Sequence, residues 1–77
     1  MNRLSSISLN QICMIESVDE SDVKDRLYEM GIYPEQSIQV IRKAPFGDPL
    51  VVKIGNQEII LRHNEAELII IKENKAH

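Results

Sequence analysis

Residues 37–62 read SIQVIRKAPFGDPLVVKIGNQEIILR, and the fold follows from the periodicity of this stretch. Apolar and polar side chains alternate within it, which is the period of two of a half-buried β-strand. Two prolines and Gly47 interrupt the pattern between Ala44 and Pro49, and Gly55-Asn56 is a two-residue hairpin signal. The stretch therefore predicts three consecutive antiparallel strands, at residues 37–43, 50–54 and 57–62.

Strand patterning continues on both sides of this stretch. Ile12–Val18 is short and rich in β-forming residues, and it follows an extended, apolar-patterned start. A run from Glu65 or Ala66 to Ile71 predicts the last strand, which a polar turn at residues 63–65 joins to its predecessor.

One helix is predicted, between the strands at residues 12–18 and 37–43. Val23, Leu27 and Met30 fall on one helical stripe, and Asp19 or Ser21 can cap its start. Gly31 then occupies the position after the helix where a left-handed backbone is usual, and Ile32 can fold back on the last turn. Pro34 prevents any continuation.

The predicted class is mainly β with one short helix. Because five strands follow one another by short links, we expect an antiparallel meander curled into a small barrel, whose closure would remove exposed edges. Residues 1–72 form the single predicted domain and 73–77 the tail. Some apolar residues fall on outward faces, where they could support a dimer or be covered by the helix or the N-terminal segment. They are Ile41, Val51, Ile60 and Ile69.

The charge balance argues against a nucleic-acid partner. Nine Lys and Arg residues stand against twelve Asp and Glu, and the basic residues are scattered apart from Arg42-Lys43. Phosphate contacts dominate nucleic-acid affinity, so a binder usually carries a basic excess. A nucleic-acid-binding barrel is therefore the least favoured alternative.

The chain shows no pattern of catalytic or metal-ligating residues. Cys13, His63 and His77 lack the spacing of a zinc site, and three glycines supply no phosphate-binding loop. A domain of this size is also too small to enclose a typical substrate pocket. We predict no enzyme, no cofactor and no intrinsic metal site, with a weak Fe(II)-responsive sensor using carboxylates or His63 as the alternative.

The lone cysteine indicates a reducing compartment. One thiol cannot form an internal disulfide, and the N-terminus has no apolar region of the signal-peptide type. The longest apolar runs are far shorter than the ~20 residues of a membrane helix. We expect a cytoplasmic protein with no membrane insertion.

A surface for another protein is the remaining kind of site. Tyr28 and Tyr33 are amphipathic and could lie at an exposed apolar margin. Phe46, at the tip of the Pro-Gly loop, either covers the barrel or anchors a partner. Leu27 and Met30 fit the core better than the surface.

Three ordered motifs resemble one known family. Leu27–Pro34 looks like the pattern L-x-x-[LM]-G-[LIF]-x-P, Ala44–Leu50 is close to A-P-[LFM]-G-D-P-[IL], and Leu61–Ala66 is similar to L-R-x-x-E-A. Together they resemble the FeoA family, small cytoplasmic proteins of bacterial ferrous iron transport, over nearly the whole chain. One departure is Glu35, which follows Pro34 where the family usually has glycine.

The resemblance implies an SH3-like small antiparallel β-barrel and a partner. That partner is FeoB, the membrane permease that carries a cytoplasmic G domain, and the implied role is to support or regulate ferrous iron uptake. Family members are not thought to be enzymes or to carry an invariant metal site. On this reading, the residues predicted to contact the partner surround the helix end and the Pro-Gly loop: Leu27, Met30, Gly31, Tyr33, Pro34, Phe46 and Asp48. The turns of the barrel need the same residues, so a structural role for them stays open.

Overall fold

A computed structural model describes residues 2–73 of the 77-residue chain, so the predicted tail lies outside the described residues apart from Glu73. Six strands form one sheet in this part of the chain, and every pairing is antiparallel. In chain order the strands are β1 (Asn2–Arg3), β2 (Ile12–Val18), β3 (Ser37–Lys43), β4 (Leu50–Ile54), β5 (Gln57–Leu61) and β6 (Ile69–Ile71).

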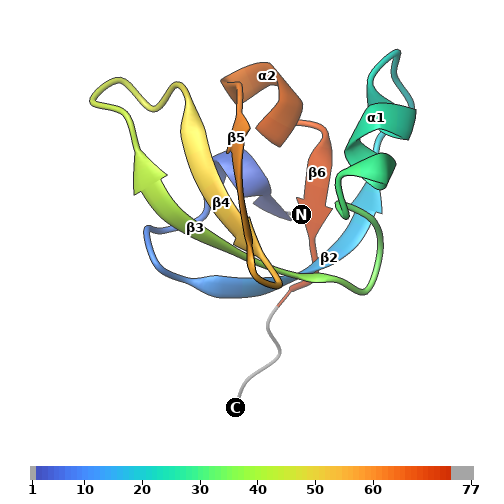
Figure 1. The fold of residues 1–77 in the computed structure, drawn as a ribbon, viewed down its shortest axis with the longest axis horizontal. Helices are drawn as coiled ribbons and strands as arrows, with labels where there is room; N and C mark the ends of the chain where they lie inside the picture. Colours follow the sequence, from blue (N-terminus) through green and yellow to red (C-terminus); the bar gives the residue numbers. More distant parts are fainter. Residues whose placement is uncertain (1, 74–77) are drawn as a thin grey trace.

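The spatial order of the strands is β1-β6-β2-β3-β4-β5. Figure 1 shows the sheet curling so that α1 (Lys24–Glu29) stands at one side and α2 (His63–Ala66) lies above its concave face. The outermost strands, β1 and β5, are not paired with each other within residues 2–73. The antiparallel, mainly β class is confirmed, and the sheet is open rather than a closed barrel over these residues.

The strand predictions were accurate in the middle of the chain and wrong at its ends. Residues 12–18, 37–43 and 50–54 are strands as predicted, and β5 ends one residue early, at Leu61. Five strands and one helix were too few for residues 2–73, because Asn2–Arg3 pairs with β6 and residues 63–66 form α2. The last strand consequently begins at Ile69 rather than at Glu65 or Ala66.

The core lies between the concave face of the sheet and the short helices. Leu50, Val52 and Ile54 alternate inward along β4 and are buried, as the periodicity predicted. Leu4, in a 3-10 helix at Leu4–Ser6, is fully buried against this core. Ile69 was predicted to face outward and is also fully buried, because β6 is a central strand between β1 and β2.

The helix α1 docks through the predicted stripe. Leu27 is fully buried, and Val23 and Met30 pack against the core while partly buried. The predicted Asp19 cap is wrong: the N-cap position is Val23, with no side-chain capping bond among the described residues, and Asp19 pairs with Arg3 instead. Ser21 accepts a hydrogen bond from the Val23 amide at 3.3 Å.

The end of α1 has the predicted glycine geometry. Gly31 has φ +94°, and its amide donates to the Tyr28 carbonyl at 3.0 Å. The Ile32 amide donates to the Leu27 carbonyl at 2.9 Å, which completes a Schellman motif and buries Ile32. The chain is thereby redirected toward the sheet.

A type II turn follows at residues 33–36. The Gln36 amide donates to the Tyr33 carbonyl at 3.3 Å, Pro34 is second in the turn, and Glu35 is third with φ +75°. A residue with a Cβ is strained in this left-handed conformation. The glycine usual at this position in the family that the chain resembles would adopt this conformation without strain.

Glu35→Gly should relieve this strain. We expect the glycine variant to be more stable than Glu35→Ala by about 1 kcal/mol in urea unfolding. Both variants lose the exposed ion pair between Glu35 and Lys72 (2.6 Å), so their difference isolates the backbone effect. Equal unfolding free energies for the two variants would contradict the strained turn.

Candidate functional site

The residues predicted to contact a partner divide by exposure. Leu27 is fully buried, so its side chain belongs to the core. Met30, Gly31 and Pro34 are partly buried. Tyr33 is 40% exposed and Phe46 is 98% exposed, and Asp48 is also at the surface. The exposed members are therefore the ones that a partner can reach.

An aromatic pair marks the end of α1. The rings of Tyr28 and Tyr33 have centroids 6.0 Å apart at an interplanar angle of 48°, and Lys24 Nζ lies 5.6 Å from the Tyr28 centroid. Lys24 also donates to Glu20 at 2.6 Å, and this hydrogen bond raises the pKa of Lys24. The pair presents half-exposed apolar rings beside a cation, next to Pro34.

The loop between β3 and β4 presents Phe46. The Gly47 amide donates to the Ala44 carbonyl at 2.8 Å, and the Ala44 amide donates to the Pro49 carbonyl at 3.1 Å. Gly47 has φ +81°, a conformation that favours glycine. The loop is thus held by its own backbone while Phe46 extends into solvent. The alternative in which Phe46 covers the barrel is wrong.

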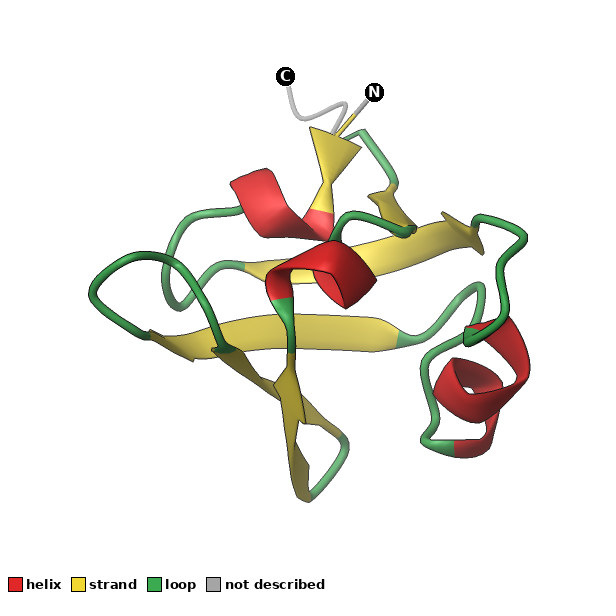
Figure 2. Ribbon diagram, turned by 90° about the horizontal axis from the view of Figure 1, so that it is seen from above, coloured by secondary structure: helices red, strands yellow, loops and turns green. Residues whose placement is uncertain are grey.

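These two regions lie on opposite sides of the molecule. Figure 1 places the β3–β4 loop at the left and α1 at the right, and the separation persists in the perpendicular view of Figure 2. The structure thus brings Tyr33 and Pro34 together but not with Phe46. The predicted contact residues form two separate surfaces, each of which stays a prediction.

Asp48 and Glu65 connect the second and third motifs to the helices. Asp48 Oδ1 accepts a hydrogen bond from the His63 amide at 3.0 Å, at the start of α2. Glu65 Oε1 accepts from the Arg62 amide at 2.9 Å, and its other oxygen pairs with Arg26 of α1. Asp48 therefore has a capping role that the sequence reading did not assign.

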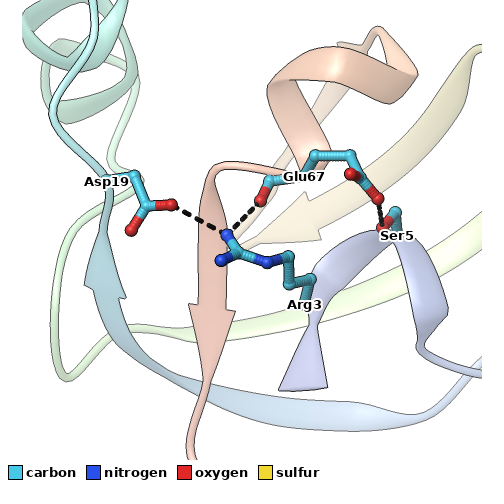
Figure 3. Close-up of polar contacts among 4 residues, drawn as sticks. All are labelled: Arg3, Ser5, Asp19 and Glu67. Carbon is cyan, nitrogen blue, oxygen red and sulfur yellow. Dashed lines mark hydrogen bonds and ion pairs between the residues drawn. The ribbon is translucent and has the colours of Figure 1, made fainter. Parts of the chain in front are cut away.

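The sequence patterns did not predict a cluster of polar contacts near the N-terminus, formed by Arg3, Ser5, Asp19 and Glu67. One guanidinium nitrogen of Arg3 donates hydrogen bonds to Asp19 Oδ2 at 2.8 Å and to the Glu67 carbonyl at 2.7 Å (Figure 3). Ser5 Oγ donates a hydrogen bond to Glu67 Oε2 at 2.6 Å. The partners are separated by up to 64 residues, so local patterns could not reveal them. The cluster ties the N-terminal segment to the link between α2 and β6.

The outer face of β2 is hollowed. A depression of about 430 Å³ is lined by part of β2 and by the residues around it: Gln11, Ile12, Cys13, Met14, Ser37, Lys72 and Glu73. Ile12 is 69% exposed there, and burial raises the pKa of the Cys13 thiol. A neutral thiol is a poor nucleophile and metal ligand.

Metal-ligating side chains are dispersed in the described part of the chain. Residues 2–73 hold no group of three or more His, Cys, Asp or Glu side chains that could bind a metal ion. His63 Nε2 lies 3.6 Å from Glu67 Oε2, and His77 lies outside the described residues. The helices among residues 2–73 are all too short to span a membrane.

Comparisons with known proteins place the chain in one family. The FeoA domain profile matches residues 2–73. Iron(II) transport protein A from Clostridium thermocellum is 36% identical over 92% of this chain, with a TM-score of 0.86, and this chain covers 44% of that protein, less than half its length. No curated protein sequence matches.

Two further structures define the fold. FeoA from Stenotrophomonas maltophilia, solved with zinc, is described as an SH3 domain protein proposed to activate ferrous iron transport. It is 28% identical, with 94% of this chain and 91% of that one covered and a TM-score of 0.81. A manganese-dependent transcriptional repressor shares the fold at 15% identity, with a TM-score of 0.84. The match covers 92% of this chain and 35% of the repressor chain. The SH3-like class that the family resemblance implies agrees with the FeoA structure from Stenotrophomonas maltophilia.

Proposed function

The chain belongs to the FeoA family, and from this premise we propose that it is a non-enzymatic accessory protein of ferrous iron uptake. It binds the cytoplasmic side of the FeoB permease and supports or regulates transport there. The family match covers residues 2–73, so the proposal concerns the whole described domain.

The exposure of Phe46 is the observation that supports this proposal most. At 98% exposed, the ring makes almost no contact with its own domain, and the loop that carries it is fixed by backbone hydrogen bonds. A preorganised loop backbone lowers the entropy cost of binding, and an aromatic side chain that it presents can fill a pocket as an anchor. Burying one such ring in a partner is worth about 2 kcal/mol.

A binding measurement with detergent-solubilised FeoB tests the proposal. Phe46→Ala should raise the Kd by roughly 30-fold, the equivalent of about 2 kcal/mol, without changing unfolding. Tyr33→Ala tests the second surface separately, because the two regions lie on opposite sides of the domain. Ile12→Ala, which changes another exposed apolar side chain on a different strand, is the control.

The outcomes separate the two surfaces. A loss with Phe46→Ala alone assigns the contact to the β3–β4 loop, and a loss with Tyr33→Ala alone moves it to the end of α1. If wild-type protein does not bind FeoB at all, the proposed role through this partner is wrong.

A further inference from the structure

The strand β5 is an unprotected edge of the sheet. Within residues 2–73 it pairs with β4 alone, in five consecutive pairs without a register shift. In a two-residue hairpin the residues flanking the loop exchange both hydrogen bonds, so the alternate residues direct theirs away from the partner strand. Those residues are Glu58 and Ile60, whose amide and carbonyl groups face the open edge.

The side chains of β5 do not protect this edge. Natural sheets protect an exposed edge with lysines, prolines, bulges or a covering helix. The sequence of β5 is Gln-Glu-Ile-Ile-Leu, with Glu58 its single charge, and Ile60 is 68% exposed. An open, unbulged strand with an exposed isoleucine is typical of an edge that another strand covers.

The outer face of this edge is complementary to itself. Arg62 continues the extended backbone beyond β5, with φ −72° and ψ 156°, so Glu58, Ile60 and Arg62 lie on one face. An antiparallel pairing of two such strands with Ile60 on the two-fold axis sets Ile60 against Ile60. It also sets each Glu58 against the Arg62 of the other copy.

The side chains of Arg62 and Glu58 can form an ion pair between the two copies. The Arg62 side chain has no hydrogen-bond or ion-pair partner among the described residues, although Glu58 already accepts from Arg42 at 2.9 Å. A second cation beside Glu58 would complete a three-residue network rather than compete with a buried pair.

We propose that β5 pairs antiparallel with β5 of a second copy of this chain, centred on Ile60. The Arg62 amide already donates to Glu65 at 2.9 Å, so the pairing ends there and the hydrogen-bonded contact is short. A contact of this size gives a weak, concentration-dependent dimer. The inference does not depend on the proposed FeoB role, because it concerns a different element.

Sedimentation velocity on the full chain tests the dimer, from about 10 µM to about 1 mM, where weak interfaces dissociate. Arg62→Glu sets two carboxylates opposite each other and should raise the dimer dissociation constant at least tenfold, roughly. Adding Glu58→Arg to this variant restores opposite charges across the axis and should recover most of the association. Ile60→Lys should also dissociate the dimer.

Ile12→Lys is the matched control, because Ile12 is 69% exposed and lies on β2, a strand between β6 and β3 rather than at the end of the sheet. It should leave association unchanged while adding the same charge as Ile60→Lys. Urea unfolding of each variant confirms that the domain remains folded. A chain that is monomeric throughout the range overturns the proposal, and so does a double variant no better than Arg62→Glu. If a monomeric chain loses FeoB binding with Ile60→Lys, the edge accepts a strand of that partner and the second-copy assignment is wrong.

Discussion

Leu27→Ala should lower the free energy of unfolding by about 3 kcal/mol, a large fraction of the stability of a domain this small. Leu27 is fully buried in the core and supplies the carbonyl that the Ile32 amide binds at 2.9 Å. Truncating its side chain leaves a cavity beneath α1, which has six residues and depends on docking to persist. The result would identify the first residue of the first motif as structural.

Two variants keep this prediction testable. Glu29→Ala changes an exposed residue of the same helix and should alter stability by less than about 0.5 kcal/mol. Leu27→Met preserves most of the volume, so it should cost under about 1.5 kcal/mol and remain folded if the alanine variant does not. Urea unfolding at low temperature measures all three. A Leu27→Ala domain as stable as Glu29→Ala would place this side chain outside the core.

Local sequence patterns predicted those elements whose cause is local. The boundaries of β2, β3 and β4 follow from alternation and turn residues, and the end of α1 follows from Gly31. The hairpin between β4 and β5 likewise follows from its two loop residues, Gly55 and Asn56. In each case the residues that dictate the conformation are adjacent to it in the chain.

The remaining features depend on partners distant in sequence. Asp19 was expected to cap α1, and it instead pairs with Arg3 of β1, 16 residues earlier. Residues 63–65 were predicted as a turn because the helix they belong to, α2, is a single turn held by Asp48 and by Glu65. Such contacts become visible only once the sheet has brought the segments together.

The candidate site was predictable to the same degree. Phe46 was singled out as an aromatic residue in a stiff loop, and the structure exposes it as an anchor would require. The prediction that Phe46 and Tyr33 belong to one surface was wrong, because the β3–β4 loop and the end of α1 lie on opposite sides of the domain. Asp48 of the second motif instead contacts His63 of the third, and Glu65 of the third contacts Arg26 of α1, one residue before the first motif.

Glu65→Ala should lower the free energy of unfolding by about 2 kcal/mol. The Glu65 side chain is 12% exposed and has two partners, the Arg62 amide at 2.9 Å and the Arg26 guanidinium. Its removal takes away the cap of α2 and the link between α2 and α1 together. Hydrogen exchange at the Arg62 amide should accelerate at the same time, because that amide loses its acceptor.

The exposed pair of Glu58 and Arg42 supplies the comparison. Their side chains are 55% and 64% exposed, so Glu58→Ala should cost less than about 1 kcal/mol when measured on dilute protein. A double-mutant cycle of Glu65→Ala with Arg26→Ala separates the ion pair from the cap, and we expect the cap to account for about half of the loss. Equal costs for Glu65→Ala and Glu58→Ala would contradict this role. The third motif would then have no part in holding α1 and α2 together, and a binding role for its exposed residues would be the stronger interpretation.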